Sequence, residues 1–156
     1  KLTMITKDQV LEAQEKWGNG VVSIGALKDK RAECEAFASA FLDARYAFDN
    51  ASVLFKPTKC EIEQFRPTKA EALSYFIAGD DRACTEDKGF AIQPWTKVRF
   101  ENTGIILDEK RAIAMGNYFF TDLNGYEAKV EYTFGYQLQG DVLKIDLHHS
   151  SFPYSH

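Results

Sequence analysis

The sequence of 156 residues lacks the features that mark several large protein classes. No apolar run approaches the roughly 20 residues that a membrane-spanning helix needs, and no segment resembles a signal peptide. The 19 Lys and Arg residues are scattered among 23 Asp and Glu residues, and the net charge is −4. Nucleic-acid binding normally depends on a clustered basic face. We therefore expect no nucleic-acid partner and no membrane partner.

Cysteine is scarce, and the common catalytic motifs are missing. Cys34, Cys60 and Cys84 are odd in number and widely spaced, without a CxxC pair or a zinc-ligand spacing. We expect free thiols in a reduced compartment. The sequence also has no P-loop, no nucleophile elbow, no HExxH zinc motif and no dinucleotide glycine motif. These absences argue against nucleotide-binding enzymes, serine hydrolases of the elbow type and zinc proteases.

The length is that of one ordinary domain, which we place at residues 1–156. At this size about 70% of the surface of the unfolded chain can be buried, which is enough for a core without disulfides. The first residue is Lys1 rather than Met. We interpret this as excision of the domain from a longer precursor.

The first half of the chain has helical periodicity. A capping box of Thr6 and Gln9 predicts the start of one helix, and the glycines at 18 and 20 predict its end. Residues at helical spacing from Glu33 to Phe48, all apolar except Glu33, predict a second helix, and a capping box of Thr68 and Glu71 predicts a third, which ends at Gly79. Short strands are predicted at 53–55 and 61–65, and a loop at 80–94.

The second half has the pattern of four long strands. They are predicted at 97–107, 111–122, 126–139 and 142–151, separated by turns at 108–109, 124–125 and 140–141. Asn124-Gly125 between alternating runs is the strongest of these hairpin signals. Helices followed by an antiparallel meander predict an α+β domain. A curved sheet wrapped around a long helix is the NTF2-like cone, whose mouth leads to a deep pocket where chemistry is expected.

The last strand carries the polar residues of greatest interest. Neighbours in a strand point to opposite faces, so Leu143, Ile145 and Leu147 share a face with His149 and Ser151. Because that row is apolar until its last two members, we expect His149 and Ser151 to close a buried row at a pocket floor. If the alternation is broken, His148 and Ser150 take their place. The competing interpretation is that these residues are ordinary strand residues near the rim of the sheet, with hydrogen-bonded side chains.

A metal centre is not expected here. His148 and His149 are adjacent in a strand and therefore diverge, and the remaining histidine is at position 156. A catalytic zinc usually has three protein ligands, and the sequence offers no such set.

Four segments resemble the iota-type carbonic anhydrases, which are relatives of the association domain of calcium/calmodulin-dependent kinase II: Val53–Thr58, Gln64–Thr68, Ala72–Phe76 and His148–Tyr154. The resemblance covers about residues 6 to 154, and the His-His-Ser-Ser-x-Pro-Tyr ending is its most specific part. It implies hydration of carbon dioxide to bicarbonate without a metal, with manganese as the alternative cofactor. It also implies a homodimer and a chloroplast or other soluble compartment of an alga or another photosynthetic organism.

The resemblance also implies the site residues. Thr58 matches through its Lys-Pro-Thr context and Tyr75 through Leu-Ser-Tyr-Phe, and His149 and Ser151 match through the ending. Tyr46 joins Thr58, Tyr75 and Ser151 as a substrate-binding residue. Our hypothesis is that the hydroxyl groups hold a water molecule while His149, whose ordinary pKa is about 6.5, accepts its proton.

Two other functions compete with this hypothesis. One is a non-enzymatic association domain that assembles through its sheet and loops. The other is a different NTF2-like lyase or isomerase, such as a polyketide cyclase or a ketosteroid isomerase. Those enzymes use a carboxylate base in the pocket, and the predicted strands show no clear inward carboxylate.

Overall fold

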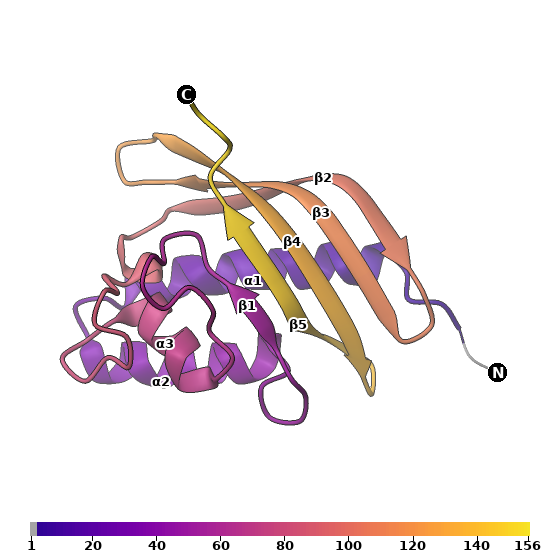
Figure 1. Cartoon of the computed structure of the whole chain (residues 1–156), viewed down its shortest axis with the longest axis horizontal. Coiled ribbons are helices and arrows are strands. Elements are labelled where there is room, and N and C mark those ends of the chain that lie inside the picture. Colours follow the sequence, from indigo (N-terminus) through magenta and orange to yellow (C-terminus); the bar gives the residue numbers. More distant parts are fainter. Residues whose placement is uncertain (1–2) are drawn as a thin grey trace.

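The computed structural model describes residues 3–156, so Lys1, from which a longer precursor was predicted, lies outside the described residues. One five-stranded sheet has the order β1-β5-β4-β3-β2, with β1 parallel to β5 and the other pairs antiparallel (Figure 1). The elements in chain order are α1 (Lys7–Ala26), α2 (Arg31–Arg45), β1 (Leu54–Lys56), α3 (Lys69–Ile77), the short 3-10 helix η1 (Phe90–Ile92), β2 (Lys97–Leu107), β3 (Arg111–Thr121), β4 (Glu127–Gln139) and β5 (Val142–Ser151).

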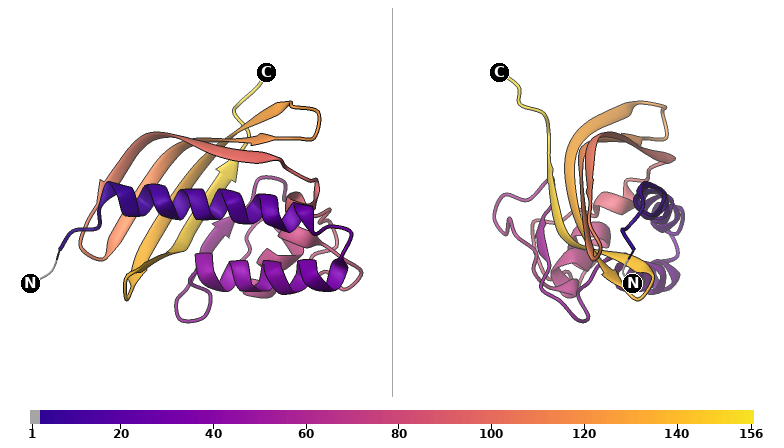
Figure 2. Two further views of the ribbon diagram at one scale, coloured as in Figure 1. Left: turned by 180° about the vertical axis from the view of Figure 1, so that it is seen from behind. Right: turned by 90° about the vertical axis from the view of Figure 1, so that its right-hand side faces the viewer.

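The helices lie on one face of the curved sheet. Figure 2 shows α1 crossing the concave side of the strands, with α2 beside it. Alternation along β4 turns Val130, Tyr132, Phe134 and Tyr136 toward the helices, and all four are buried. Trp17 of α1 lies at the centre of this core and is 1% exposed. The α+β architecture and the four long strands predicted from the sequence are confirmed.

Helix α1 is longer than predicted. Both predicted capping boxes are present, at Thr6 and at Thr68, but α1 continues through the glycines to Ala26. A Cβ atom added to Gly18 would lie 3.1 Å from the side chain of Val98, and one added to Gly20 would clash with the Phe41 ring. These glycines therefore allow close packing of α1 against β2 and α2, and their prediction as helix terminators was wrong.

Two strand predictions need correction. No strand forms at 61–65, because the backbone N–H groups there donate to the carboxylate of Glu86 instead of a sheet partner. The sheet is also mixed rather than wholly antiparallel, since β1 pairs in parallel with the end of β5. Among residues 3–156, no helix combines the length and the apolar character needed to cross a membrane.

Candidate active site

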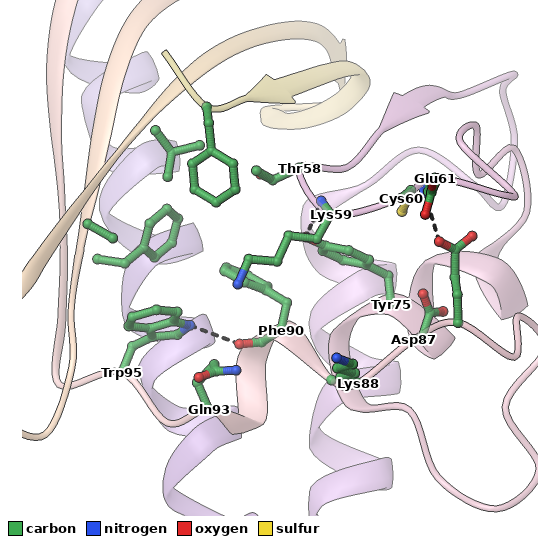
Figure 3. A pocket seen from close by; sticks show the side chains of 16 residues that line it. Thr58, Lys59, Cys60, Glu61, Tyr75, Asp87, Lys88, Phe90, Gln93 and Trp95 are labelled. Atoms are coloured by element: carbon green, nitrogen blue, oxygen red, sulfur yellow. Dashed lines mark hydrogen bonds between the residues drawn. The ribbon is translucent and has the colours of Figure 1, made fainter. Parts of the chain in front are cut away.

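A cavity of about 560 Å³ lies between the loop that follows β1, helix α3, the segment around η1 and strands β3 and β4 (Figure 3). Thr58 and Tyr75, both predicted site residues, line it. Thr58 follows β1 directly, and Tyr75 projects from α3. The structure therefore brings these two predicted residues to one cavity.

Strand β5 contains a bulge that decides which histidine faces the interior. Ile145 pairs with Tyr136 and Leu147 pairs with Gly135, so Asp146 is an extra residue without a partner. One extra residue reverses the alternation of side chains beyond it. Leu143 and Ile145 point inward as predicted, but the inward residues after the bulge are His148 and Ser150, at 3% and 1% exposure.

The prediction that His149 and Ser151 face the pocket is therefore wrong, and the alternative pair takes their place. His149 is exposed on the outer face of the sheet, paired with Thr133. Ser151 also faces outward, and its hydroxyl donates to the carboxylate of Glu131 at 3.1 Å.

A continuous chain of hydrogen bonds, here called the hydroxyl relay, leads from the cavity into the core. Thr58 Oγ1 lies 2.6 Å from Ser150 Oγ, and the Tyr118 hydroxyl donates to the same serine oxygen at 2.6 Å. Tyr118 Oη lies 3.0 Å from His148 Nε2. On the other side of the ring, His148 Nδ1 lies 2.8 Å from Tyr46 Oη.

The far end of the hydroxyl relay fixes its direction. The Trp17 indole N–H donates to Tyr46 Oη at 3.1 Å, and an indole nitrogen can only donate. Tyr118 donates its one hydrogen to Ser150, so it can only accept at His148 Nε2, and His148 Nδ1 then accepts the hydrogen of Tyr46. A neutral histidine with one accepting nitrogen carries its hydrogen on the other, so Nε2–H donates to Tyr118 Oη.

The same direction continues to the cavity. Tyr118 donates to Ser150, and the bond between Ser150 and Thr58 fits either hydroxyl as the donor; the direction that continues the relay has Ser150 donating to Thr58 Oγ1. Thr58 accepts this bond with one of its two lone pairs. Its own hydrogen and its second lone pair are then directed to the cavity, where they can act on a bound molecule.

The environment of His148 keeps its ring neutral and fixed. The ring stacks on Phe55 at a centroid distance of 4.6 Å and meets the edge of Phe134 at 4.5 Å. Burial lowers the pKa of His148 well below its usual 6.5, with a smaller effect of the neighbouring His149. At neutral pH the imidazole therefore supports the hydroxyl relay as a neutral group.

Tyr75 supplies a second neutral hydroxyl at the cavity. Its oxygen accepts the backbone N–H of Lys59 at 3.2 Å. Burial raises the pKa of Tyr75, so the phenol stays protonated at neutral pH. Its hydrogen is available as a donor to the cavity beside Thr58.

A buried ion pair supports the wall of the cavity. Arg66 and Asp87, both with fully buried side chains, form two hydrogen bonds of 2.8 and 2.7 Å, and Ser74 donates to the same carboxylate. Next to them, the Glu86 carboxylate accepts the N–H groups of residues 61, 62 and 63. These backbone bonds, the one from Glu61 first, lower the pKa of Glu86. Together the two acids fix the loops on both sides of the cavity.

Replacing Asp87 with alanine is expected to destabilise the protein by about 3–5 kcal/mol, because the Arg66 guanidinium would remain buried without its partner. Urea unfolding followed by far-UV circular dichroism measures the change. The matched control is Asp81→Ala, an exposed carboxylate nearby, which should stay within about 0.5 kcal/mol of the parent protein. Equal effects of both substitutions would contradict the supporting role of the ion pair.

Potential metal ligands lie away from the hydroxyl relay. Within residues 3–156, a set of three close ligand atoms occurs at Glu63, Glu71 and Cys84, and none of these residues lines the cavity. Glu71 already accepts hydrogen bonds from Thr68 in the capping box of α3. At the relay itself, both nitrogens of His148 are bonded to tyrosine hydroxyls. The donor set of the hydroxyl relay therefore does not fit manganese or zinc, and the Glu86 and Asp87 carboxylates at the cavity are already bound by backbone N–H groups and by Arg66.

Two members of the hydroxyl relay were not predicted as site residues, and one predicted site residue lies away from the cavity. Tyr118 extends the inward row of Ala112 and Ala114 on β3, and a hydroxyl in such an apolar row could have drawn attention to it. Trp17 is the other member that was not predicted. Tyr46 is fully buried at the end of α2 and contacts His148 rather than the cavity.

Comparisons with known proteins agree on one family. A sequence model of the family described as metal-independent carbonic anhydrase matches residues 8–152. A protein described as a metal-independent carbonic anhydrase from Nostoc sp. is 41% identical over 155 residues, which is 96% of this chain and 75% of the relative.

Solved structures show the same likeness. An iota-carbonic anhydrase from a cyanobacterium, crystallised with bicarbonate, superposes with a TM-score of 0.92 at 39% identity and covers 97% of this chain and 94% of its own. A putative calcium/calmodulin-dependent kinase II association domain from Xanthomonas campestris has a TM-score of 0.65 at 21% identity, covering 94% and 87% of the two chains. An NTF2-like protein from Shewanella oneidensis reaches 0.56 at 15% identity, covering 94% and 99%. The last two matches support the NTF2-like fold alone.

Proposed function

The chain belongs to the family of metal-independent carbonic anhydrases, and from this premise we propose that it interconverts carbon dioxide and bicarbonate at the cavity end of the hydroxyl relay. The observation that carries the proposal is the continuous hydrogen-bonded chain from Trp17 to Thr58; with Ser150 as the donor of its last bond, one donor and one lone pair of Thr58 face the cavity. The bicarbonate bound to the cyanobacterial relative supports an anion of this kind as the ligand.

Thr58 can act on both reactants at once. A water molecule attacks the carbon of carbon dioxide and forms the new C–O bond. The second lone pair of Thr58 Oγ1 accepts a proton from this water as the Thr58 hydroxyl hydrogen passes to a carbon dioxide oxygen. The product is carbonic acid, which releases its proton to the solvent at the open side of the cavity.

The other hydroxyls stabilise the charge that develops in this step. Ser150 donates to Thr58 and so keeps its proton directed to the cavity. The Tyr75 hydroxyl adds a neutral donor for the developing oxygen charge, in the manner of an oxyanion hole. Thr58 and Tyr75 are therefore the catalytic residues of this proposal.

His148 acts as a positioning residue in this mechanism, not as the general base that the sequence analysis assigned to its neighbour. Its lowered pKa makes it a weak base, and both of its nitrogens are already bonded to tyrosines. It transmits the direction set by Trp17 and Tyr46 to Tyr118 and Ser150.

Exchange of ¹⁸O between labelled carbon dioxide and water, followed by mass spectrometry, tests the activity. We expect the chain to accelerate the loss of label from carbon dioxide far above the buffer rate. An unchanged rate would leave the chain as a binding or assembly domain of the NTF2-like type.

We propose that the reaction uses no metal. The family description supports this, and so does the chemistry of the hydroxyl relay, whose imidazole has no free nitrogen. Manganese remains the alternative that metal analysis of the active protein tests.

The outer face of the sheet supports a homodimer. One register row crosses all five strands through Leu54, Leu147, Gly135, Ile113 and Ile106, and Met115 lies in the next row. These six residues are here called the apolar stripe. Leu54 and Ile106 are each 69% exposed and Met115 is 54% exposed. Gly135 is buried beside the Arg111–Asp146 ion pair, and the exposed apolar members of the stripe fit a twofold contact between two copies of the chain.

Replacing Met115 with glutamate is expected to weaken the dimer roughly 100-fold, because an unpaired carboxylate would be buried between the two sheets. Size-exclusion chromatography with light scattering should then show a monomer where the parent protein is a dimer. The control is Leu123→Glu, an equally apolar and exposed position in the β3–β4 turn, which should remain dimeric. A monomeric parent protein would contradict the proposed contact.

The source organism and compartment are the last part of the proposal. Two of the matched relatives come from cyanobacteria, which supports a photosynthetic host. More specifically, we propose a location in the chloroplast of an alga. Immunolocalisation of the protein in its source cells tests it.

A further inference from the structure

The cavity is much larger than the proposed reaction needs. Its volume is about 560 Å³, which falls in the range of about 300–1,000 Å³ for sites that hold drug-sized ligands. Water occupies about 30 Å³ in the liquid, and bicarbonate has only four non-hydrogen atoms. Most of the cavity is therefore not used by a water molecule and carbon dioxide beside Thr58.

The unused part has an aromatic wall, made of Tyr75, Phe90, Trp95 and Phe120. Phe90 stacks on Tyr75 at 5.7 Å and meets Phe120 at 5.1 Å, and Trp95 lies 5.5 Å from Phe120. The Trp95 indole N–H donates to the Phe90 carbonyl at 2.8 Å, so the tryptophan has no free donor for a ligand. The wall presents ring surfaces, which favour a flat apolar group of similar size.

Two lysine ammonium groups at the cavity are free to bind an anion. The carboxylates of Asp87 and Glu86 are occupied, by Arg66 and Ser74 and by three backbone N–H groups. Across residues 3–156, the Lys59 and Lys88 ammonium groups have no hydrogen-bond or ion-pair partner, and the Glu61 carboxylate is the one unpaired acid among the lining residues. The formal charges of the lining residues and of Arg66 sum to zero, and the two lysine ammonium groups are the cationic groups left free for an anion.

Lys59 places its charge inside the cavity. Figure 3 shows its side chain crossing the space between Thr58 and Phe90, with the ammonium group at its far end. The nitrogen also lies 5.9 Å from the centroid of the Phe152 ring. A carboxylate held by Lys59 would thus lie near the Thr58 hydroxyl, with the aromatic wall beside it.

We propose that this cavity also binds a small aromatic monocarboxylate. Its ring lies on the aromatic wall, and its carboxylate lies between the Lys59 ammonium group and the Thr58 hydroxyl, where bicarbonate is placed by the proposed function. Such an acid excludes bicarbonate and inhibits the enzyme. Only the inhibition depends on the proposed function, because binding itself is measurable without turnover.

Isothermal titration calorimetry with benzoate, acetate and benzyl alcohol tests the two parts of this site. Benzoate is expected to bind at least about tenfold more tightly than acetate, which lacks the ring, and than benzyl alcohol, which lacks the charge. Bicarbonate should compete with benzoate. Benzoate that binds no better than acetate would overturn the aromatic part, and equal binding of benzyl alcohol would overturn the anionic part.

The variant Lys59→Met tests whether Lys59 itself, and not the overall charge of the surface, binds the carboxylate of the ligand. We expect it to weaken benzoate binding about tenfold, and the control Lys110→Met, an exposed lysine in the β2–β3 turn, to leave it unchanged. Equal affinities of the two variants would overturn the role of Lys59. A protein that binds benzoate but does not accelerate ¹⁸O exchange would refute the proposed function alone, and the opposite result would refute this inference alone.

Discussion

Replacing Thr58 with valine is expected to lower kcat/KM for carbon dioxide hydration by about 10²- to 10³-fold, the usual effect of removing one preorganised donor at a reacting oxygen. Valine has nearly the same shape as threonine but offers neither a hydrogen nor a lone pair. In the proposed mechanism both are needed, since the hydroxyl accepts a proton from water and donates one to carbon dioxide. Stopped-flow assays with a pH indicator measure the change.

Thr58→Ser is the matched control for this prediction. It keeps the hydroxyl that bonds to Ser150 at 2.6 Å, so it should retain most of the activity. Thr103→Val serves as a second control, because Thr103 is an exposed threonine outside the cavity. Full activity of Thr58→Val would show that the reaction does not pass through this side chain.

The two adjacent histidines are expected to respond in opposite ways. His148→Ala should lower kcat/KM by about 10- to 100-fold, because it removes the group that orients Tyr118 and Ser150, a loss smaller than that of a group touching the substrate. His149→Ala should change the activity less than twofold, since this residue is exposed on the outer face. The same stopped-flow assay on both variants measures this.

His148→Gln separates positioning from packing. Glutamine can accept from Tyr46 with its oxygen and donate to Tyr118 with its nitrogen, so it should recover part of the lost activity. The pH profile gives a second readout. Because the pKa of His148 lies well below 6.5, the activity of the parent protein should show no step near that pH from the titration of His148. Loss of activity in His149→Ala alone would overturn the inward placement of His148.

The sequence was sufficient for the architecture, because the relevant signals are local. Turn residues such as Asn124-Gly125 and Gly140-Asp141 separate strands whose alternation is visible in the sequence, and the capping boxes at Thr6 and Thr68 mark true helix starts. The error at Gly18 and Gly20 has a different origin. Whether a glycine ends a helix or permits close packing depends on its distant neighbours, here Val98 and Phe41, which the local pattern does not reveal.

The strand alternation failed for a related reason. It was correct as far as Ile145 and wrong after Asp146, because the bulge depends on pairing between β4 and β5. Gly135, opposite the bulge, was the available signal: a glycine within a strand often marks such a site, and a Cβ there would lie 2.8 Å from that of Leu147.

The hydroxyl relay was only partly predictable. The resemblance pointed to Thr58 and Tyr75, and both line the cavity. Trp17 and Tyr118, in contrast, join Tyr46 and Ser150 over separations of 29 and 32 residues. Such contacts arise only when α1, α2, β3 and β5 pack together, so no local pattern could predict the direction of the hydrogen bonds.

The central claim is that the hydroxyl relay activates water without a metal. The most direct test is stopped-flow carbon dioxide hydration by protein dialysed against a strong chelator, with the metal content determined on the same sample. We predict full activity at far less than one metal ion per chain, and loss of that activity in Thr58→Val. Loss of activity on chelation, with recovery on addition of manganese or zinc, would contradict the proposed mechanism.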